Sequence, residues 1–399
     1  MSRAAFLGLL LAAQLSSPQC GATSSSTSPS TGTSPSATNL VSIVVNAGPA
    51  NNALNEPFTS VTICVPATSN CQTIDGILVD TGSIGLRILS SKLTLPLNTQ
   101  QAGNGSPLVE CLPFLDSVTW GPVQTADVRL ASEQASNIPI QVIGTDKFPS
   151  IPGDCSSQGP PEETVDDLAA NGILGIGFFK EDCGLACALT GSSNPGLYYA
   201  CPSSGGCQVT TVPTANQVLN PVARFSADNN GSAIQLPVVQ PGGLPSTTGV
   251  LIFGIGTQAN NGLGSAKVMT VDGDGNIHTV FNGQTYTNTF IDSGSNGIFF
   301  LDSASTSLPD CTNSTGFYCP PVLRPFSATV GGANGVSSVV AFSAGNVDAL
   351  NATFSVMAEA TGSQPGGFDW GLPFFYGRTV FTAIEGQTTP GGVGPYWAY

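Results

Sequence analysis

One short motif occurs twice in this chain, each time at the end of an apolar, strand-like run. The two copies are Asp80-Thr81-Gly82-Ser83 and Asp292-Ser293-Gly294-Ser295. An aspartate at the end of a buried strand is costly unless hydrogen-bond donors surround it. A glycine two residues later permits a tight turn whose N–H groups and neighbouring hydroxyls can supply those donors. One copy alone would indicate only a turn, but the repetition predicts two related lobes that bring Asp80 and Asp292 together.

The segments that follow each copy extend the pattern. Asn171-Gly172-Ile173-Leu174-Gly175-Ile176-Gly177-Phe178 comes after the first copy, and Trp370-Gly371-Leu372-Pro373-Phe374-Phe375 followed by Val380-Phe381 comes after the second. Between them lies the apolar run Gly249-Val250-Leu251-Ile252-Phe253. In this order the elements resemble the pepsin-like aspartic peptidases, and the resemblance covers roughly residues 40–385. It implies an all-β fold with two β-barrel-like lobes and a cleft between them.

The resemblance also assigns roles to residues. It implies that Asp80 and Asp292 are the catalytic pair, supported by a second shell of Thr81, Gly82, Ser83, Ser293, Gly294 and Ser295. Trp120-Gly121 stands where the family carries the Tyr-Gly pair of a β-hairpin flap, and the indole N–H could still donate a hydrogen bond. A buried aromatic at a hairpin end is the alternative interpretation of Trp120. Leu372 departs from the family, in which many members have aspartate after the glycine.

Length and local pattern agree with two β lobes. A chain of 399 residues is long enough for two domains. Short apolar runs recur between glycine, proline and asparagine, and only 163–170 has the pattern of a short helix. We expect a signal peptide over 1–20, a Ser/Thr/Pro-rich linker over 21–38, an N-terminal lobe over 39–225 and a C-terminal lobe over 226–399. A cysteine-rich insertion, 179–221, has no obvious counterpart in the family.

The N-terminus and the cysteines predict export. Arg3 precedes an apolar stretch of the length of a secretory signal core. Cys20 is either the lipidated first residue of a lipoprotein or is removed with the signal peptide. The other ten cysteines are disulfide candidates in an oxidising compartment, with Cys111 and Cys155 paired only by elimination and the pairing within 183–207 left open. They are Cys64, Cys71, Cys111, Cys155, Cys183, Cys187, Cys201, Cys207, Cys311 and Cys319. Zinc bound by Cys183, Cys187, Cys201 and Cys207 is the alternative, although their spacing is unlike common zinc sites.

Charge and composition exclude other chemistries. The net charge of −15 argues against binding to nucleic acid. His278 is the only histidine, so a serine or cysteine triad would have to use it, and a metal mechanism lacks a histidine cluster. Asp272-Gly273-Asp274-Gly275-Asn276 begins like a calcium loop, but Gly283 stands where a bidentate glutamate is needed. The sequence therefore predicts no cofactor and no metal.

The function expected from these observations is peptide-bond hydrolysis by an exported aspartic endopeptidase. Two adjacent carboxyls cannot both ionise easily, so they hold one proton and activate water. The alternative is a non-catalytic binding protein or surface lipoprotein on the same fold, since fold does not dictate function. We expect a peptide or protein substrate in the cleft, a monomer, and membrane contact only through a lipid anchor at Cys20.

Overall fold

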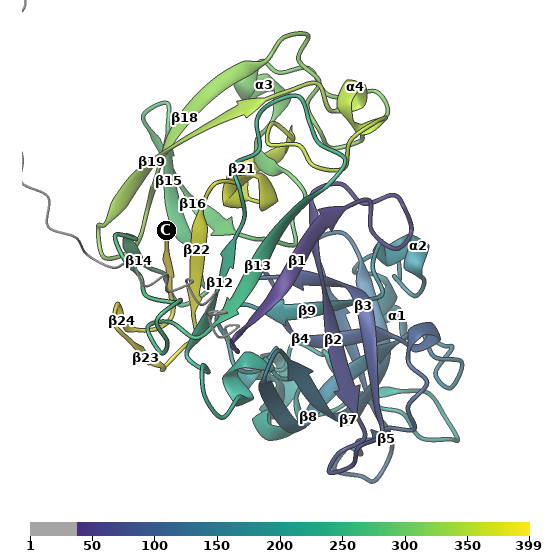
Figure 1. The fold of residues 1–399 in the computed structure, drawn as a ribbon. Helices are drawn as coiled ribbons and strands as arrows, with labels where there is room; N and C mark the ends of the chain where they lie inside the picture. Colours follow the sequence, from purple (N-terminus) through teal and green to yellow (C-terminus); the bar gives the residue numbers. More distant parts are fainter. Residues whose placement is uncertain (1–37) are drawn as a thin grey trace, which may run out of the picture. The chain divides into compact units, whose positions relative to one another are not determined.

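β-strands are the predominant regular secondary structure in the part of the chain that the computed structural model describes, residues 38–399 (Figure 1). The predicted signal peptide, nearly all of the predicted linker and the possible lipidation site at Cys20 lie outside the described residues. Short α-helices connect some of the strands: α1 (Gly153–Ser156), α2 (Val165–Leu168), α3 (Ser303–Thr306) and α4 (Val347–Asn351). Turns of 3-10 helix lie at 90–92, 184–188, 191–193, 214–216, 222–224 and 372–375. In residues 38–399 we find no helix that is both long and apolar enough to cross a membrane.

The first half of the chain forms a closed barrel. Its strands are β2 (Glu56–Cys64), β3 (Cys71–Asp80), β4 (Ile84–Leu89), β7 (Val118–Leu130), β8 (Glu133–Ile143) and β9 (Gly172–Ile176). They follow the order β7-β8-β4-β9-β3-β2, and pairing of β2 with β7 closes the ring. Side chains that point inward, such as Val61, Val79 and Leu86, are fully buried.

The barrel belongs to a larger sheet that continues at both ends. One extension, β6 (Leu108–Pro113), β10 (Tyr198–Ala200) and β11 (Gln208–Val209), follows β7, which also pairs with β5 (Asn98–Thr99). The other is β1 (Leu40–Asn46), β13 (Thr247–Phe253), β12 (Gly231–Gln235), β22 (Thr379–Ala383), β25 (Tyr396–Ala398) and β14 (Val268–Thr270). Because β1 pairs with β13, one sheet runs across the lobe boundary predicted at 225/226.

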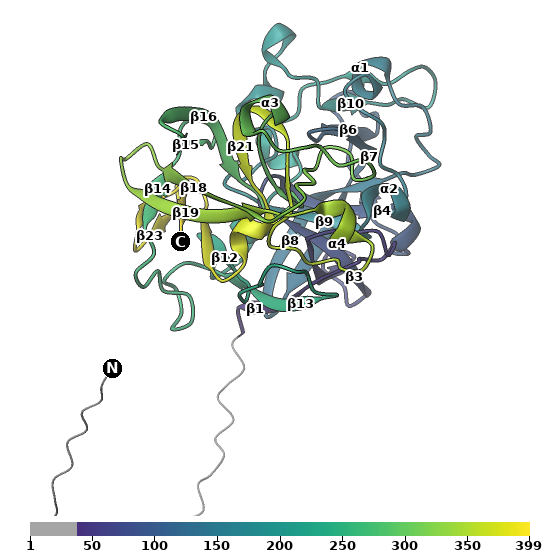
Figure 2. The same cartoon turned by 90° about the horizontal axis from the view of Figure 1, so that it is seen from above.

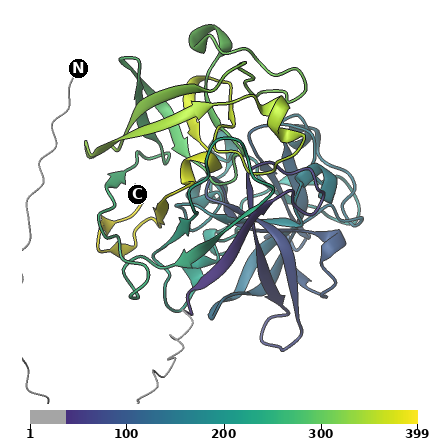
Figure 3. The same cartoon turned by 45° about the horizontal axis from the view of Figure 1, so that its top comes forward.

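The second lobe is built on a separate, nearly closed sheet. Its order is β19 (Ser337–Ala344), β18 (Arg324–Gly331), β15 (Ile277–Phe281), β16 (Gln284–Ile291), β21 (Gln364–Trp370), β17 (Ile298–Leu301) and β20 (Thr361–Gly362). Strands β23 (Thr388–Thr389) and β24 (Gly392–Val393) form a small hairpin. Figures 2 and 3 show the green and yellow strands of this sheet grouped apart from the purple and blue strands of the barrel. The fold is thus the all-β, two-lobed arrangement that the sequence predicts.

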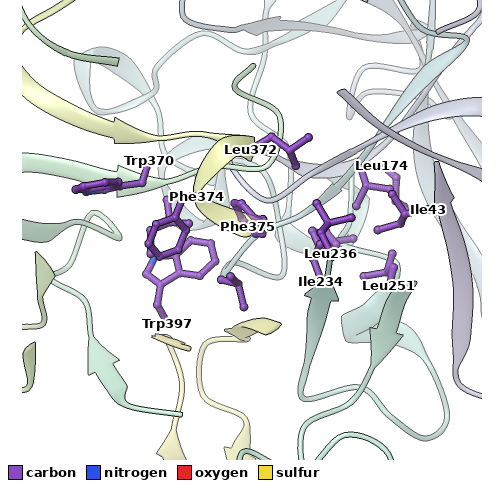
Figure 4. Packing of buried hydrophobic residues seen from close by; sticks show 14 of the residues in the cluster. Ile43, Leu174, Ile234, Leu236, Leu251, Trp370, Leu372, Phe374, Phe375 and Trp397 are labelled. Atoms are coloured by element: carbon purple, nitrogen blue, oxygen red, sulfur yellow. The ribbon is translucent and has the colours of Figure 1, made fainter. Parts of the chain in front are cut away.

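Both lobes repeat one local arrangement. Strand β3 pairs in parallel with β9, and β9 pairs antiparallel with β4. In the second lobe β16 pairs in parallel with β21, and β21 pairs antiparallel with β17. Apolar side chains from both copies, including Leu174 and Trp370, belong to one buried cluster that spans the lobes (Figure 4). This shared core holds the ends of β3 and β16 in place.

The ten cysteines in the described residues form five disulfides. The pairs are Cys64–Cys71, Cys111–Cys155, Cys183–Cys187, Cys201–Cys207 and Cys311–Cys319. The pairing of Cys111 with Cys155 by elimination is confirmed, and the pairing left open within 183–207 is now defined. The zinc alternative is wrong because all four thiols concerned are used in bridges.

Candidate active site

The two Asp-containing motifs meet between the lobes. Asp80 is the last residue of β3, and Asp292 directly follows β16. The Gly82 N–H donates to Asp80 Oδ1 (2.7 Å), and the Gly294 N–H donates to Asp292 Oδ1 (2.8 Å). Each carboxyl is therefore held by the turn of its own motif, as the sequence predicts.

The two loops are also locked to each other. The backbone N–H of Thr81 donates to Ser293 Oγ (3.1 Å), and the N–H of Ser293 donates to Thr81 Oγ1 (2.9 Å). The Ser293 hydroxyl in turn donates to the Val79 carbonyl (2.7 Å). Thr81 and Ser293 thus bind one loop to the other rather than orienting the carboxylates directly, which refines the role predicted for them.

The glycines of the motifs allow this close approach. A Cβ added to Gly82 would lie 2.6 Å from Asp292 Cγ, and one added to Gly294 would lie 2.7 Å from Asp80 Oδ1. Any larger residue would push the opposing carboxyl away. Each motif therefore contributes the space that the other motif's aspartate occupies.

The serines that end the motifs behave differently. The Ser295 hydroxyl donates to Asp292 Oδ2 (2.8 Å), which fits the predicted supporting role. The Ser83 hydroxyl is buried and has no hydrogen-bond partner among residues 38–399. The two halves of the site are therefore not equivalent.

The surroundings favour a proton on Asp292. Part of Asp292 is open to the cleft, but withdrawal of its carboxyl from bulk solvent raises its pKa well above the usual range. The negative charge of Asp80 and a hydrogen bond between the two carboxyls raise that pKa further, while the Ser295 hydroxyl lowers it. The pair can therefore hold one proton at a pH where ordinary aspartates are ionised.

A third carboxyl, not predicted from the sequence, lies beside the pair. Asp369 on β21 is 1% exposed, and neither of its oxygens has a hydrogen-bond donor among the described residues. Burial raises the pKa of Asp369 to about 8; the nearby Ser295 hydroxyl lowers this pKa, and the charge of Asp80 raises it. Ser295 has one hydroxyl proton and directs it to Asp292, which leaves Asp369 unpaired.

Two cavities open on either side of the pair, and both are lined by Asp80, Asp292 and Asp369. The first, about 450 Å³, has a mostly apolar surface formed by side chains such as Phe178 and Phe290, and Asp182 and Asp274 also line it; we call it the apolar cavity. The second, about 570 Å³, is lined by several further carboxyls and is named the acidic cavity. Together they form a cleft with the aspartate pair at its centre.

A β-hairpin covers this cleft, but not with the predicted residues. The turn between β6 and β7 places Phe114 and Leu115 in the lining of both cavities, and Leu115 is 84% exposed. The flap assignment of Trp120 and Gly121 is wrong in this respect. Trp120 lies along β7 with its side chain buried, where its indole N–H donates to the Phe148 carbonyl (2.9 Å), and Gly121 packs against the backbone of β8.

The cysteine-rich insertion reaches the cleft from the side. Its Asp182 lines the apolar cavity and forms a buried ion pair with Arg87 of β4 (3.1 Å). Arg87 also binds Glu110 of β6 (2.9 Å), and the Tyr198 hydroxyl donates to Asp182 (2.7 Å). The insertion is therefore fastened to the barrel and to the strand that leads into the covering hairpin.

Comparison with known proteins agrees with this geometry at the level of fold. The crystal structure of an aspartic proteinase from Irpex lacteus superposes with a TM-score of 0.53 at 17% sequence identity, covering 90% of this chain and 96% of the proteinase. No curated protein matches the sequence. A family model described as "Protein of unknown function (DUF3443)" matches residues 35–399. Because that match spans nearly the whole chain, the protein belongs to the DUF3443 family.

Proposed function

We propose that this protein is an exported aspartic endopeptidase in which Asp80 and Asp292 share one proton and activate water. The observation that carries the proposal is the meeting of two carboxyls from duplicated loops at the centre of a covered cleft. The fold resembles that of an aspartic proteinase, which supports hydrolysis. Five disulfides support export, because such bridges persist in oxidising compartments.

The proposed mechanism uses the two carboxyls as base and acid. In the resting pair the proton lies on Asp292, because that carboxyl has the raised pKa. The Asp80 carboxylate removes a proton from water while the oxygen of that water bonds to the scissile carbonyl carbon. Asp292 donates its proton to the carbonyl oxygen. The C–N bond of the tetrahedral intermediate then breaks as Asp80 passes its proton to the leaving nitrogen. A hydroxyl of the intermediate returns a proton to Asp292 as the new carboxyl group forms, and no covalent enzyme intermediate forms.

The covering hairpin completes the site. Phe114 and Leu115 line both cavities together with the aspartate pair and can exclude water once a peptide is bound, which strengthens electrostatic interactions within the cleft. A peptide substrate would run from one cavity to the other beneath them. The protein would act as a monomer, since both aspartates come from one chain.

The direct test of this function is digestion of a denatured protein between pH 3 and 7. We expect internal cleavage, detected as new peptide termini by mass spectrometry, and inhibition by a statine-containing peptide that mimics the hydrated amide. Activity should persist above the pH at which ordinary aspartates ionise and fall as pH rises through the pKa of Asp292. An intact substrate across this range would reject the peptidase in favour of a non-catalytic binding protein.

A further inference from the structure

The acidic cavity contains more carboxyl groups than hydrolysis requires. Besides the aspartate pair, it is lined by Glu56, Asp116, Glu162, Asp167 and Asp369. None of its lining residues, all of which lie in the described part of the chain, is lysine, arginine or histidine. The cavity thus gathers seven carboxyls with no cation from the protein itself.

Asp369 breaks the symmetry between the lobes. In the second lobe Asp369 of β21 pairs with Phe290, which lies two residues before Asp292. At the corresponding position of the first lobe, Ile173 pairs with Leu78, which lies two residues before Asp80. The same structural position is therefore apolar in one lobe and a buried carboxyl in the other. A carboxyl that is 1% exposed, without a donor, is unfavourable unless something outside the chain partners it.

A second orphaned carboxyl lies in the same cavity. Glu56 Oε2 is buried without a hydrogen-bond partner among the described residues. Burial, together with the charge of Glu162, raises the pKa of Glu56 to about 8. The pKa of Glu162 is itself raised to about 7, mainly by burial, although its hydrogen bond with Ser117 opposes the rise. A bound cation would return both groups to their charged forms.

We propose that the acidic cavity is a subsite for the arginine or lysine side chain of a peptide substrate. This inference rests on the proposed function and deepens it: the scissile bond would lie between a basic residue in the acidic cavity and an apolar residue in the apolar cavity. Charge complementarity selects the basic side chain, because an arginine carries up to five donors that can reach separated carboxylates.

A metal ion fits the acidic cavity less well. Within residues 38–399, no three of its carboxyls bring one oxygen each to within 4.8 Å of one another, whereas a divalent cation needs its ligands gathered closely. A long, flexible cationic side chain can instead approach carboxyls that are spread along the wall. The arrangement therefore favours a basic side chain.

The test compares two peptides that differ only in the charge of one residue. One carries arginine beside the scissile bond and the other carries citrulline, which has nearly the same shape but no charge. We expect wild-type protein at pH 6 to cleave the arginine peptide with a kcat/KM at least about tenfold higher, which corresponds to about 1.4 kcal/mol. Equal rates for the two peptides would overturn the subsite.

Variants locate the preference in the cavity. Glu56→Gln combined with Glu162→Gln should reduce the arginine-to-citrulline ratio towards one, and Glu56→Gln alone should reduce it in part. Glu163→Gln and Asp166→Asn are matched controls, because they remove neighbouring charges that do not line the cavity, and they should leave the ratio unchanged. A ratio that survives in the double variant would contradict the proposal.

Binding separates this inference from the proposed function. Peptides of the same pair with a reduced, uncleavable bond can be titrated calorimetrically. Tighter binding of the reduced-bond arginine peptide, together with no cleavage of either ordinary peptide, would reject the peptidase and retain the basic subsite. Equal affinity for the two reduced-bond peptides, together with cleavage of both ordinary peptides, would retain the peptidase and reject the subsite.

Discussion

Replacing Asp292 or Asp80 by asparagine is expected to abolish peptide hydrolysis. Asparagine keeps the shape of aspartate but can neither hold the shared proton nor accept one from water. General acid–base groups contribute about 10²–10⁴-fold to rate, and since both roles are interrupted we expect a loss in kcat at the upper end of that range. The measurement is the initial rate on a fluorogenic peptide at the optimum pH of the wild type.

The fold should survive these substitutions. In Asp292→Asn the Gly294 N–H can still donate to the side-chain carbonyl of the new asparagine, and the pair keeps the single negative charge that it carries when Asp292 is protonated. Unfolding temperatures close to that of the wild type would show that activity, not structure, has been lost. Asp166→Asn, an exposed change of the same kind, is the control. Full activity in either Asp80→Asn or Asp292→Asn would refute the roles assigned to the aspartate pair.

Stability is expected to fall as pH rises from about 4 to 8. Burial raises the pKa of Asp369 to about 8. Burial and the charge of Glu162 raise the pKa of Glu56 to about 8. Burial also raises the pKa of Glu162 to about 7. In the unfolded chain such groups ionise near pH 4, so between these limits the native state binds more protons than the unfolded state. Their stabilisation is complete below pH 4 and is lost as pH rises through the folded pKa values.

The size of this effect can be bounded. Each group changes the free energy of unfolding by at most about 1.4 kcal/mol per pH unit, so together the three can remove several kcal/mol. Urea unfolding at pH 5 and at pH 7.5 measures this change in the free energy of unfolding. Asp369→Asn should be more stable than the wild type at pH 7.5 and should flatten the dependence, whereas Asp166→Asn should follow the wild type. Stability that rises over this interval would contradict the burial of these charges.

Much of the fold follows from local sequence signals. The ends of β3 and β16 are encoded in apolar runs that stop at an aspartate followed two residues later by glycine. The short-range disulfides follow from cysteines that are close in the chain. In contrast, the helix expected over 163–170 is reduced to α2, because Thr164 caps it and Ala169 adopts a left-handed conformation that ends it.

The rest of the candidate site depends on long-range register. Trp120 is buried because the β6–β7 pairing sets it opposite Cys111 and leaves the turn at Phe114 to cover the cleft. Asp369 could have been suspected from sequence, since it is an aspartate directly before the Trp370-Gly371 pair. Its place beside Asp292 depends on the alignment of β21 with β16, which no local pattern specifies.

The central claim is that the aspartate pair holds one proton at the centre of the cleft. Carbon-13 NMR of protein labelled at the aspartate carboxyls measures this directly, with Asp292→Asn used to assign the signal. The account predicts that Asp292 stays protonated well above pH 4, and that its apparent pKa falls in Asp80→Asn because the neighbouring charge is gone. Ionisation of Asp292 near pH 4 in the wild type, unchanged by Asp80→Asn, would contradict it.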